Sequence, residues 1–175
     1  YILTVFYYDR YNILNKYYVS IRRIQMKNDR VITFIHYGSK SFDVNMFNPV
    51  SNGFKPQGGL WACPYLETED TSEWVEWCKS SDFLLDKYTK DNYFKFTLRA
   101  DTNLLVVNQS NYKTLPYKEA EGLGYIQYLD VEKLSTEYDA VYVDLWSIQN
   151  NWIIFPMWDV PSLLVFNPDV VKEVD

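Results

Sequence analysis

The chain has 175 residues, of which 47% are hydrophobic and 23% charged, and this balance excludes wholesale disorder. Its length corresponds to one globular domain of ordinary size. The 17 basic and 23 acidic residues give a net charge of −6, so a nucleic-acid partner is not expected. Aromatic residues make up 18% of the chain, which permits a large core without covalent cross-links.

Metal chemistry is also not expected. The chain has two cysteines, Cys63 and Cys78, and a single histidine, His36, too few for a closed zinc site of the usual kind. A domain with a large core does not need a disulfide, so we expect reduced thiols and a cytoplasmic location. No apolar run approaches the roughly 20 residues that span a bilayer, so no membrane partner is expected.

Residues 1–29 contain two runs rich in β-branched and aromatic residues, 1–8 and 17–25. They predict an N-terminal pair of strands added to a main domain over residues 30–175. The main domain begins with a predicted strand over residues 30–36, which follows the turn signal Asn28-Asp29. We therefore expect one domain with an N-terminal addition rather than two separate domains.

The segment from Gly38 to Gly59 is rich in Gly, Pro and Asn and has no periodicity, which predicts a long irregular loop. Helical signals are few. Asp70 to Ser72 can cap a helix that carries Trp74, Trp77 and Cys78 on one apolar face. A second helix is predicted from Asp130, where apolar residues follow at helical spacing.

The remaining elements are predicted strands, at residues 92–98, 103–108, 139–145 and 162–166. Hydrophobic residues alternate clearly at Phe94, Phe96 and Leu98, and again in the strand over 139–145, which is typical of half-buried antiparallel strands. Many strands with a few short helices predict the α+β class.

Two kinds of catalytic site have weak support. His36 is a candidate base for Cys63 or Cys78. Cys78, however, lies on the apolar face with Trp74 and Trp77, where a structural thiol is expected, and Cys63 has no neighbouring lysine or arginine that would lower its pKa. Glu73 and Glu76, three residues apart, are better interpreted as a solvated helix face than as paired acids. Glycine-rich phosphate-binding motifs are absent from the sequence.

The most informative residues lie in two short segments. His36 ends a predicted strand and is followed by Tyr37-Gly38-Ser39-Lys40, so it can offer a ring nitrogen and nearby backbone amides to a polar ligand. About 20 residues later, Gly58 and Gly59 precede Leu60-Trp61. Glycines allow a close approach of backbone and ligand, and an indole ring can stack on a planar heterocycle.

The order of these segments resembles the ADP-ribosyltransferase family, and in particular its small bacterial and phage members. ITFIHYGSKSF is similar to the first-strand motif of that family, and GGLWACP to its glycine-plus-aromatic strand. EKLSTEYDAVYVDLW and SLLVFNPDVV are similar to its closing strands. The resemblance covers about residues 30–172 and implies split antiparallel β-sheets with a few short helices, with NAD as the substrate.

The resemblance implies roles for individual residues. His36 would bond a ribose hydroxyl of NAD, the backbone of Tyr37, Gly38 and Ser39 would orient the nicotinamide amide, and Gly59 with Trp61 would form the stacking platform. A locally placed cation such as Lys40 or Lys55 would be needed, because NAD is an anion. The 38–57 loop and residues 146–157 would recognise the acceptor.

The sequence departs from the family at the catalytic glutamate. The residues before the last predicted strand are Trp158-Asp159-Val160-Pro161-Ser162, and Asp159 is the nearest carboxylate. The expected function is transfer of ADP-ribose from NAD to a target protein or other macromolecule, with Asp159, or else Glu137 or Asp144, stabilising the transition state. The alternative is a catalytically inactive relative that acts as a protein-binding inhibitor or effector, a use that suits the many aromatic residues.

Overall fold

The computed structural model describes residues 31–83, 92–120, 122, 126–155 and 157–175. The chain divides into two units, Tyr1–Val31 and Ile32–Asp175, and every helix and strand described belongs to the second. The predicted N-terminal strand pair lies outside the described residues. Within the described part of the chain, no helix is long and apolar enough to cross a membrane.

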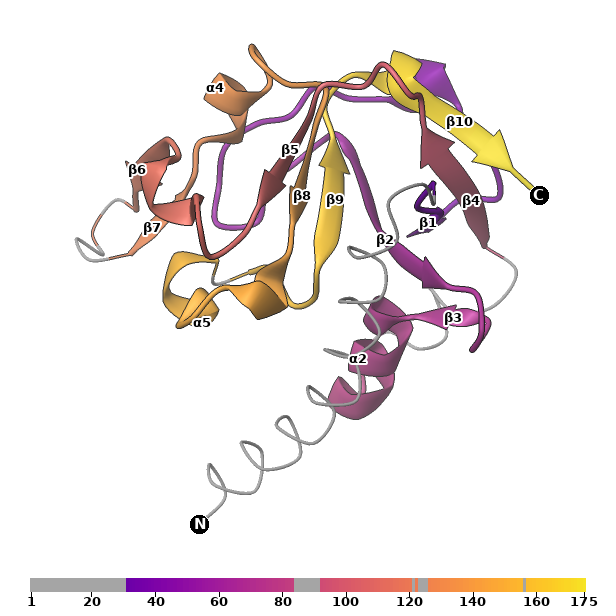
Figure 1. Cartoon of the computed structure of the whole chain (residues 1–175), viewed down its shortest axis with the longest axis horizontal. Coiled ribbons are helices and arrows are strands. Elements are labelled where there is room, and N and C mark those ends of the chain that lie inside the picture. Colours follow the sequence, from indigo (N-terminus) through magenta and orange to yellow (C-terminus); the bar gives the residue numbers. More distant parts are fainter. Residues whose placement is uncertain (1–30, 84–91, 121, 123–125, 156) are drawn as a thin grey trace. The chain divides into compact units, whose positions relative to one another are not determined.

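Short strands are the main regular elements of the second unit (Figure 1). They are β1 Phe34–Tyr37, β2 Leu60–Leu66, β3 Thr71–Ser72, β4 Tyr93–Leu98, β5 Leu104–Val107, β6 Tyr117–Glu119, β7 Gln127–Leu129, β8 Ala140–Val143, β9 Ser162–Val165 and β10 Val171–Val174. The helices are α2 Glu73–Ser81, α4 Val131–Leu134 and α5 Asn151–Ile154. This is a mixed α+β structure, as the sequence predicts.

Strand β2 connects two groups of strands. The strand order is β10-β4-β1-β2-β9-β8-β5, with β3 paired to β2 and with β6 and β7 forming a separate hairpin. The first residues of β2 pair with β9, whereas Cys63 and Pro64 pair with β1. In Figure 1, β5, β8 and β9 lie side by side, and β2 runs from that group toward β1 and β4.

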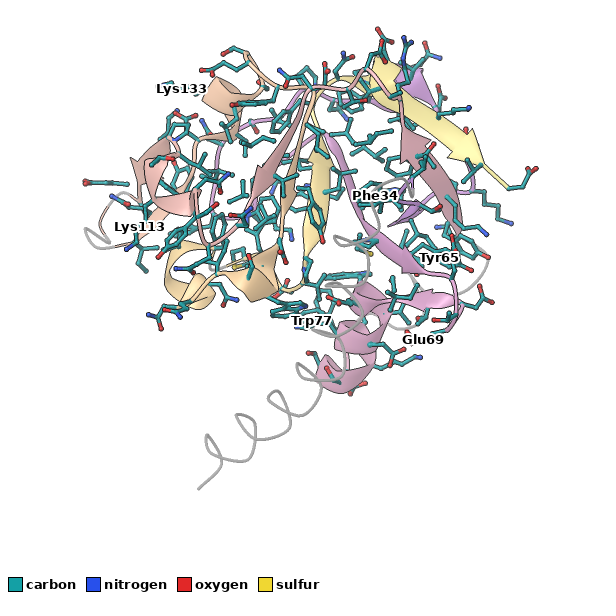
Figure 2. All side chains as sticks on the ribbon, in the orientation of Figure 1. Phe34, Tyr65, Glu69, Trp77, Lys113 and Lys133 are labelled. Carbon is teal, nitrogen blue, oxygen red and sulfur yellow. The ribbon has the colours of Figure 1, made fainter. Side chains whose placement is uncertain are left out.

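Two hydrophobic clusters lie against β8 and β9, one on each face. Val141, Val143 and Leu164 belong to one cluster, and their neighbours along the chain, Tyr142 and Leu163, belong to the other. Side chains fill the space on both sides of these strands, and Phe34 packs in the second cluster (Figure 2). Since each cluster takes alternate residues, all four residues of β8 and all four of β9 are buried.

This packing corrects one prediction. The alternation in residues 139–145 indicated a half-buried antiparallel strand; β8 is antiparallel to β9, but it is buried on both faces and its other neighbour, β5, is parallel to it. Parallel strands need a long crossover connection, and the chain between β5 and β8 supplies one through β6, β7 and α4. The prediction is correct for β4, which is antiparallel to both β1 and β10 and buries Phe94 and Phe96.

Both predicted helices are present. The Ser72 hydroxyl caps α2 by accepting a hydrogen bond from the Val75 amide, and the Asp130 carboxylate caps the single turn of α4 in the same way. The buried face of α2 differs from the predicted one. Cys78 is fully buried as predicted, but Trp74 and Trp77 are half-buried and stack on each other with ring centroids 5.1 Å apart.

Candidate functional site

β1 and β2 separate at His36. The two strands pair as far as Ile35 and Cys63, and beyond this point β2 pairs with β9 instead. At the separation, Nδ1 of His36 lies 2.7 Å from the carbonyl oxygen of Trp61. The imidazole therefore contacts β2 through a side-chain hydrogen bond where the ladder between the two strands ends.

This hydrogen bond identifies the tautomer of the ring. A carbonyl oxygen only accepts, so Nδ1 of His36 carries the proton. Burial lowers the pKa of His36, although the bond to the Trp61 carbonyl opposes that shift. At neutral pH the ring is therefore uncharged, and Nε2 is left as a hydrogen-bond acceptor. Such a nitrogen suits a ligand that presents a hydroxyl or an amide N–H.

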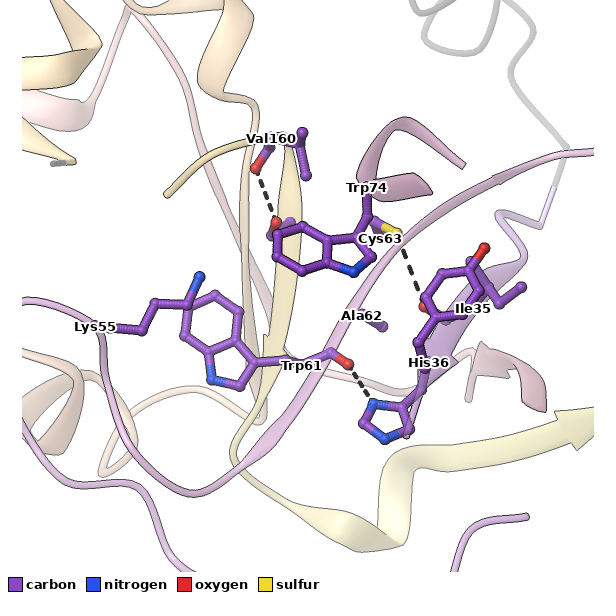
Figure 3. A pocket seen from close by; sticks show the side chains of 10 residues that line it. Ile35, His36, Lys55, Trp61, Ala62, Cys63, Trp74 and Val160 are labelled. Carbon is purple, nitrogen blue, oxygen red and sulfur yellow. Dashed lines mark hydrogen bonds between the residues drawn. The ribbon is translucent and has the colours of Figure 1, made fainter. Parts of the chain in front are cut away.

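A pocket with a volume of about 200 Å³ lies at the separation of the strands (Figure 3). Its walls come from β1, β2, the first turn of α2, the chain entering β9 and the 38–59 loop. The lining residues are Ile35, His36, Tyr37, Lys55, Trp61, Ala62, Cys63, Trp74, Val160 and Ser162. The volume is below the roughly 300–1,000 Å³ typical of sites for drug-sized ligands, so it suits one ring of a larger molecule.

Trp61 is half-buried in this pocket and has two neighbours on its ring. The Trp158 indole lies with its centroid 4.7 Å away at an interplanar angle of 59°, and Nζ of Lys55 lies 4.1 Å from the Trp61 centroid. The predicted stacking platform therefore already carries a cation–π contact from Lys55. Figure 3 shows the ammonium group beside the Trp61 ring.

Three of the predicted site residues, His36, Tyr37 and Trp61, line the pocket together. The hydroxyl of Tyr37 is hydrogen-bonded to the Ser72 hydroxyl at 3.0 Å, and burial raises the pKa of Tyr37. Of the two lysines considered as partners for an anion, Lys55 lines the pocket, whereas Lys40 is exposed and does not.

Gly38, Ser39 and Gly59 are not among the described residues that line the pocket. The Gly38 amide, predicted to help orient a nicotinamide, donates to the Asn92 carbonyl at 2.8 Å. A Cβ on Gly59 would lie 2.6 Å from Leu164 Cδ1. Packing within the chain therefore accounts for this glycine, and a role of these three residues in ligand binding stays a prediction.

Asp159 also does not line the pocket, although Val160 and Ser162, which follow it, do. The Asp159 carboxylate is close enough to act on Lys55. Burial lowers the pKa of that lysine, and the charge of Asp159 opposes the shift. Of the described residues that line the pocket, none is an aspartate or a glutamate. The charged side chain that the described lining residues provide is therefore Lys55 rather than an acid.

The arrangement does not favour a Cys/His hydrolase. Cys63 lines the pocket, but burial raises the pKa of its thiol to about 12, so the thiol is protonated at neutral pH. Its Sγ donates to the Ile35 carbonyl at 3.9 Å, while Nδ1 of His36 donates to Trp61. The Cys63 thiol is therefore not activated as a nucleophile, and the His36 imidazole is not hydrogen-bonded to it as a base.

Glu73 is a buried acid that the sequence interpretation missed. Only 8% of its surface is exposed, and Oε2 accepts a hydrogen bond from the Trp146 indole N–H at 2.7 Å. The solvated-face interpretation was wrong for Glu73, because the short strand β3 brings the first turn of α2 against the core. It suits Glu76, which is partly exposed and pairs with Lys79 at 2.9 Å.

The described residues contain no group of three or more His, Cys, Asp or Glu side chains that could hold a metal ion. The assignment of a function therefore depends on the pocket itself, because neither protein-family models, nor curated proteins, nor solved structures gave a match to this chain.

Proposed function

We propose that this chain is an ADP-ribosyltransferase-like protein that binds the nicotinamide end of NAD in the His36–Trp61 pocket and transfers ADP-ribose to a macromolecular acceptor. The hydrogen bond from His36 to the Trp61 carbonyl is the observation that carries the proposal. It joins two of the four motifs on which the family resemblance rests, although His36 and Trp61 are 25 residues apart in the sequence.

The pocket has the features that a nicotinamide group requires. It is large enough for one ring, and indole rings from Trp61 and Trp74 contribute to its walls. His36 lines the pocket and its Nε2 is left as an acceptor, which we propose takes a hydrogen bond from a ribose hydroxyl or from the carboxamide N–H. The rest of the dinucleotide would lie outside this small cavity.

The proposed reaction breaks the bond between C1′ of the ribose and the nicotinamide nitrogen. The nitrogen takes the electron pair and nicotinamide leaves, while a nucleophilic oxygen or nitrogen of the acceptor bonds to C1′ and loses its proton. Positive charge builds on the ribose during this step, and Asp159 is the carboxylate proposed to stabilise it. The charge of Asp159 already acts to raise the pKa of Lys55, which lines the pocket.

Two measurements on the purified protein test this function. At 100 times its dissociation constant, NAD should add about 2.7 kcal/mol to the free energy of unfolding, which raises Tm by roughly 5–11 °C. Nicotinamide should be released from NAD when an acceptor is present. Asp159→Asn should slow that release at least about 100-fold, because a stabilising group at the transition state is lost.

A pair of tryptophan variants provides the control. Trp61→Ala should abolish the NAD-dependent rise in Tm, whereas Trp77→Ala, which removes a half-buried indole outside the lining residues, should keep it. An equal response of the two variants to NAD would contradict binding in this pocket.

Binding without turnover is the second candidate, and one observation favours it. The described lining residues include a lysine but no carboxylate, so the pocket itself provides no acid for the transition state. A protein of this kind would use the nucleotide to stabilise a protein-binding surface. A rise in Tm with NAD, without nicotinamide release by the wild type, would establish this alternative over the transferase.

A further inference from the structure

We propose that Lys55 is the phosphate-binding residue of this pocket and selects nicotinamide nucleotides over nicotinamide compounds that lack a phosphate. The inference depends on the proposed function, since it names the group of the ligand that the pocket recognises. Lys55 is part of the pocket wall and comes from the 38–59 loop, whereas His36 and Tyr37 come from β1.

The loop that carries Lys55 is held in place at its base. Ser51 and Gln57 form an antiparallel bridge with two backbone hydrogen bonds of 3.0 and 3.1 Å. Inside this bridge, the Asn52 side chain donates to the Asp130 carboxylate at 2.8 Å, and its backbone amide donates to Glu132 at 3.0 Å. The loop is therefore attached to the N-terminal end of α4, and Lys55 extends from a fixed frame.

The ammonium group itself is positioned by two contacts. Nζ donates to the Met157 carbonyl at 3.0 Å and lies 4.1 Å from the centroid of the Trp61 ring. An ammonium has three N–H donors, and the bond to Met157 uses one of them. The side chain is half-buried, so part of it stays accessible from the pocket. Lys55 can therefore donate to a ligand without leaving its place.

The charge of Lys55 determines which part of a ligand it can contact. An oxidised nicotinamide ring is a cation, so the ammonium repels the ring and attracts the phosphate that lies one ribose away. Hydrogen bonds between an ammonium and a phosphate are stronger than those between neutral groups. Asp159 is the competing anion at this lysine, and the phosphate must bind in its presence. A nicotinamide compound without a phosphate gains nothing from Lys55.

The test compares two ligands that differ by one phosphate. Nicotinamide mononucleotide and nicotinamide riboside are titrated into the wild-type protein by calorimetry, and we expect the nucleotide to bind at least tenfold more tightly. Lys55→Met keeps an apolar side chain against Trp61 and removes the charge. In this variant the preference should fall below about twofold, and the affinity for the riboside should be unchanged or improved.

Lys40→Met is the matched control. It removes the same charge from an exposed residue four positions after His36 that does not line the pocket, and it should keep the tenfold preference. Lys55→Gln provides a second neutral variant in case the Lys55→Met protein does not fold.

The other outcomes overturn the proposal. Equal binding of both ligands to the wild type, or a preference that survives in Lys55→Met, would show that Lys55 is not the phosphate ligand, while leaving nicotinamide binding intact. If Lys40→Met lost the preference for the nucleotide, the electrostatic potential of the whole protein, rather than Lys55 alone, would be its source. If neither ligand binds the wild type, the proposed function falls together with this one.

Discussion

At the scale of single residues, Glu73 is a carboxyl group held inside the protein by the fold. It is 8% exposed, and its Oε1 is buried and has no hydrogen-bond partner among the described residues. Burial raises the pKa of Glu73 to about 7, the hydrogen bond from Trp146 opposes the shift, and the nearby Asp144 adds to it. The carboxyl group thus changes its charge close to neutral pH, inside the protein.

Ionisation of Glu73 should make stability depend on pH. The folded-state pKa of about 7 lies above the ordinary value of 4.5, so the folded state binds this proton more tightly than the unfolded state does. The stabilising contribution of the bound proton is complete below pH 4.5 and is lost as the pH rises through 7. The difference amounts to about 3 kcal/mol. Urea unfolding of the wild type at pH 4.5 and pH 8 measures it.

Glu73→Gln should remove this pH dependence, because an amide does not ionise in this range. Glu76→Gln, on the exposed side of the same helix, should keep the behaviour of the wild type. If both variants lost stability between pH 4.5 and pH 8 as the wild type does, the buried carboxyl would not be the source.

At the scale of elements, β2 depends on the two glycines that precede it. Gly58 has φ = +70°, and a Cβ at this position would lie 2.1 Å from the Pro49 carbonyl oxygen. The Gly59 amide donates to the Asn48 carbonyl at 2.8 Å, so the early part of the long loop packs directly against this turn. The glycines permit a close approach of two chain segments, and this approach directs Trp61 into the pocket.

Gly58→Ala should therefore destabilise the protein more than an alanine at another left-handed glycine. Gly122 has φ = +75° and no heavy atom within 4 Å of the position of a Cβ. Both substitutions carry a backbone cost of about 1–2 kcal/mol. Gly58→Ala should cost about 1–3 kcal/mol more because of overlap with the backbone of Pro49. Equal losses in chemical denaturation would contradict the close packing.

Local sequence patterns could predict some elements and not others. Phe94 and Phe96 alternate with polar residues, and Ser72 precedes α2 as a cap, so β4 and α2 were predictable from short-range signals. β3, β6 and β7 have two or three residues each, too few for a periodic pattern. The burial of both faces of β8 depends on packing with distant segments, which a local pattern does not contain.

At the scale of the whole described unit, the pocket arises from the way the strands are connected. β2 leaves β1 and joins β9, and His36, Trp61, Lys55 and Val160 meet at that point from four separate segments. The resemblance in two short motifs identified His36, Tyr37 and Trp61, which line the pocket. The place of Lys55 over the Trp61 ring could not be predicted, because it depends on the attachment of the loop to α4.

The central claim is that His36 is neutral, donates from Nδ1 to the Trp61 carbonyl and presents Nε2 to the nicotinamide end of NAD. His36 is the only histidine in the chain, so the nitrogen-15 NMR signals of its ring need no further assignment. A titration with NAD at pH 7 measures them directly. We predict the Nδ1–H tautomer in the free protein and a shift of the Nε2 signal that saturates with NAD. An Nε2–H tautomer, or ring signals that do not respond to NAD, would contradict the claim.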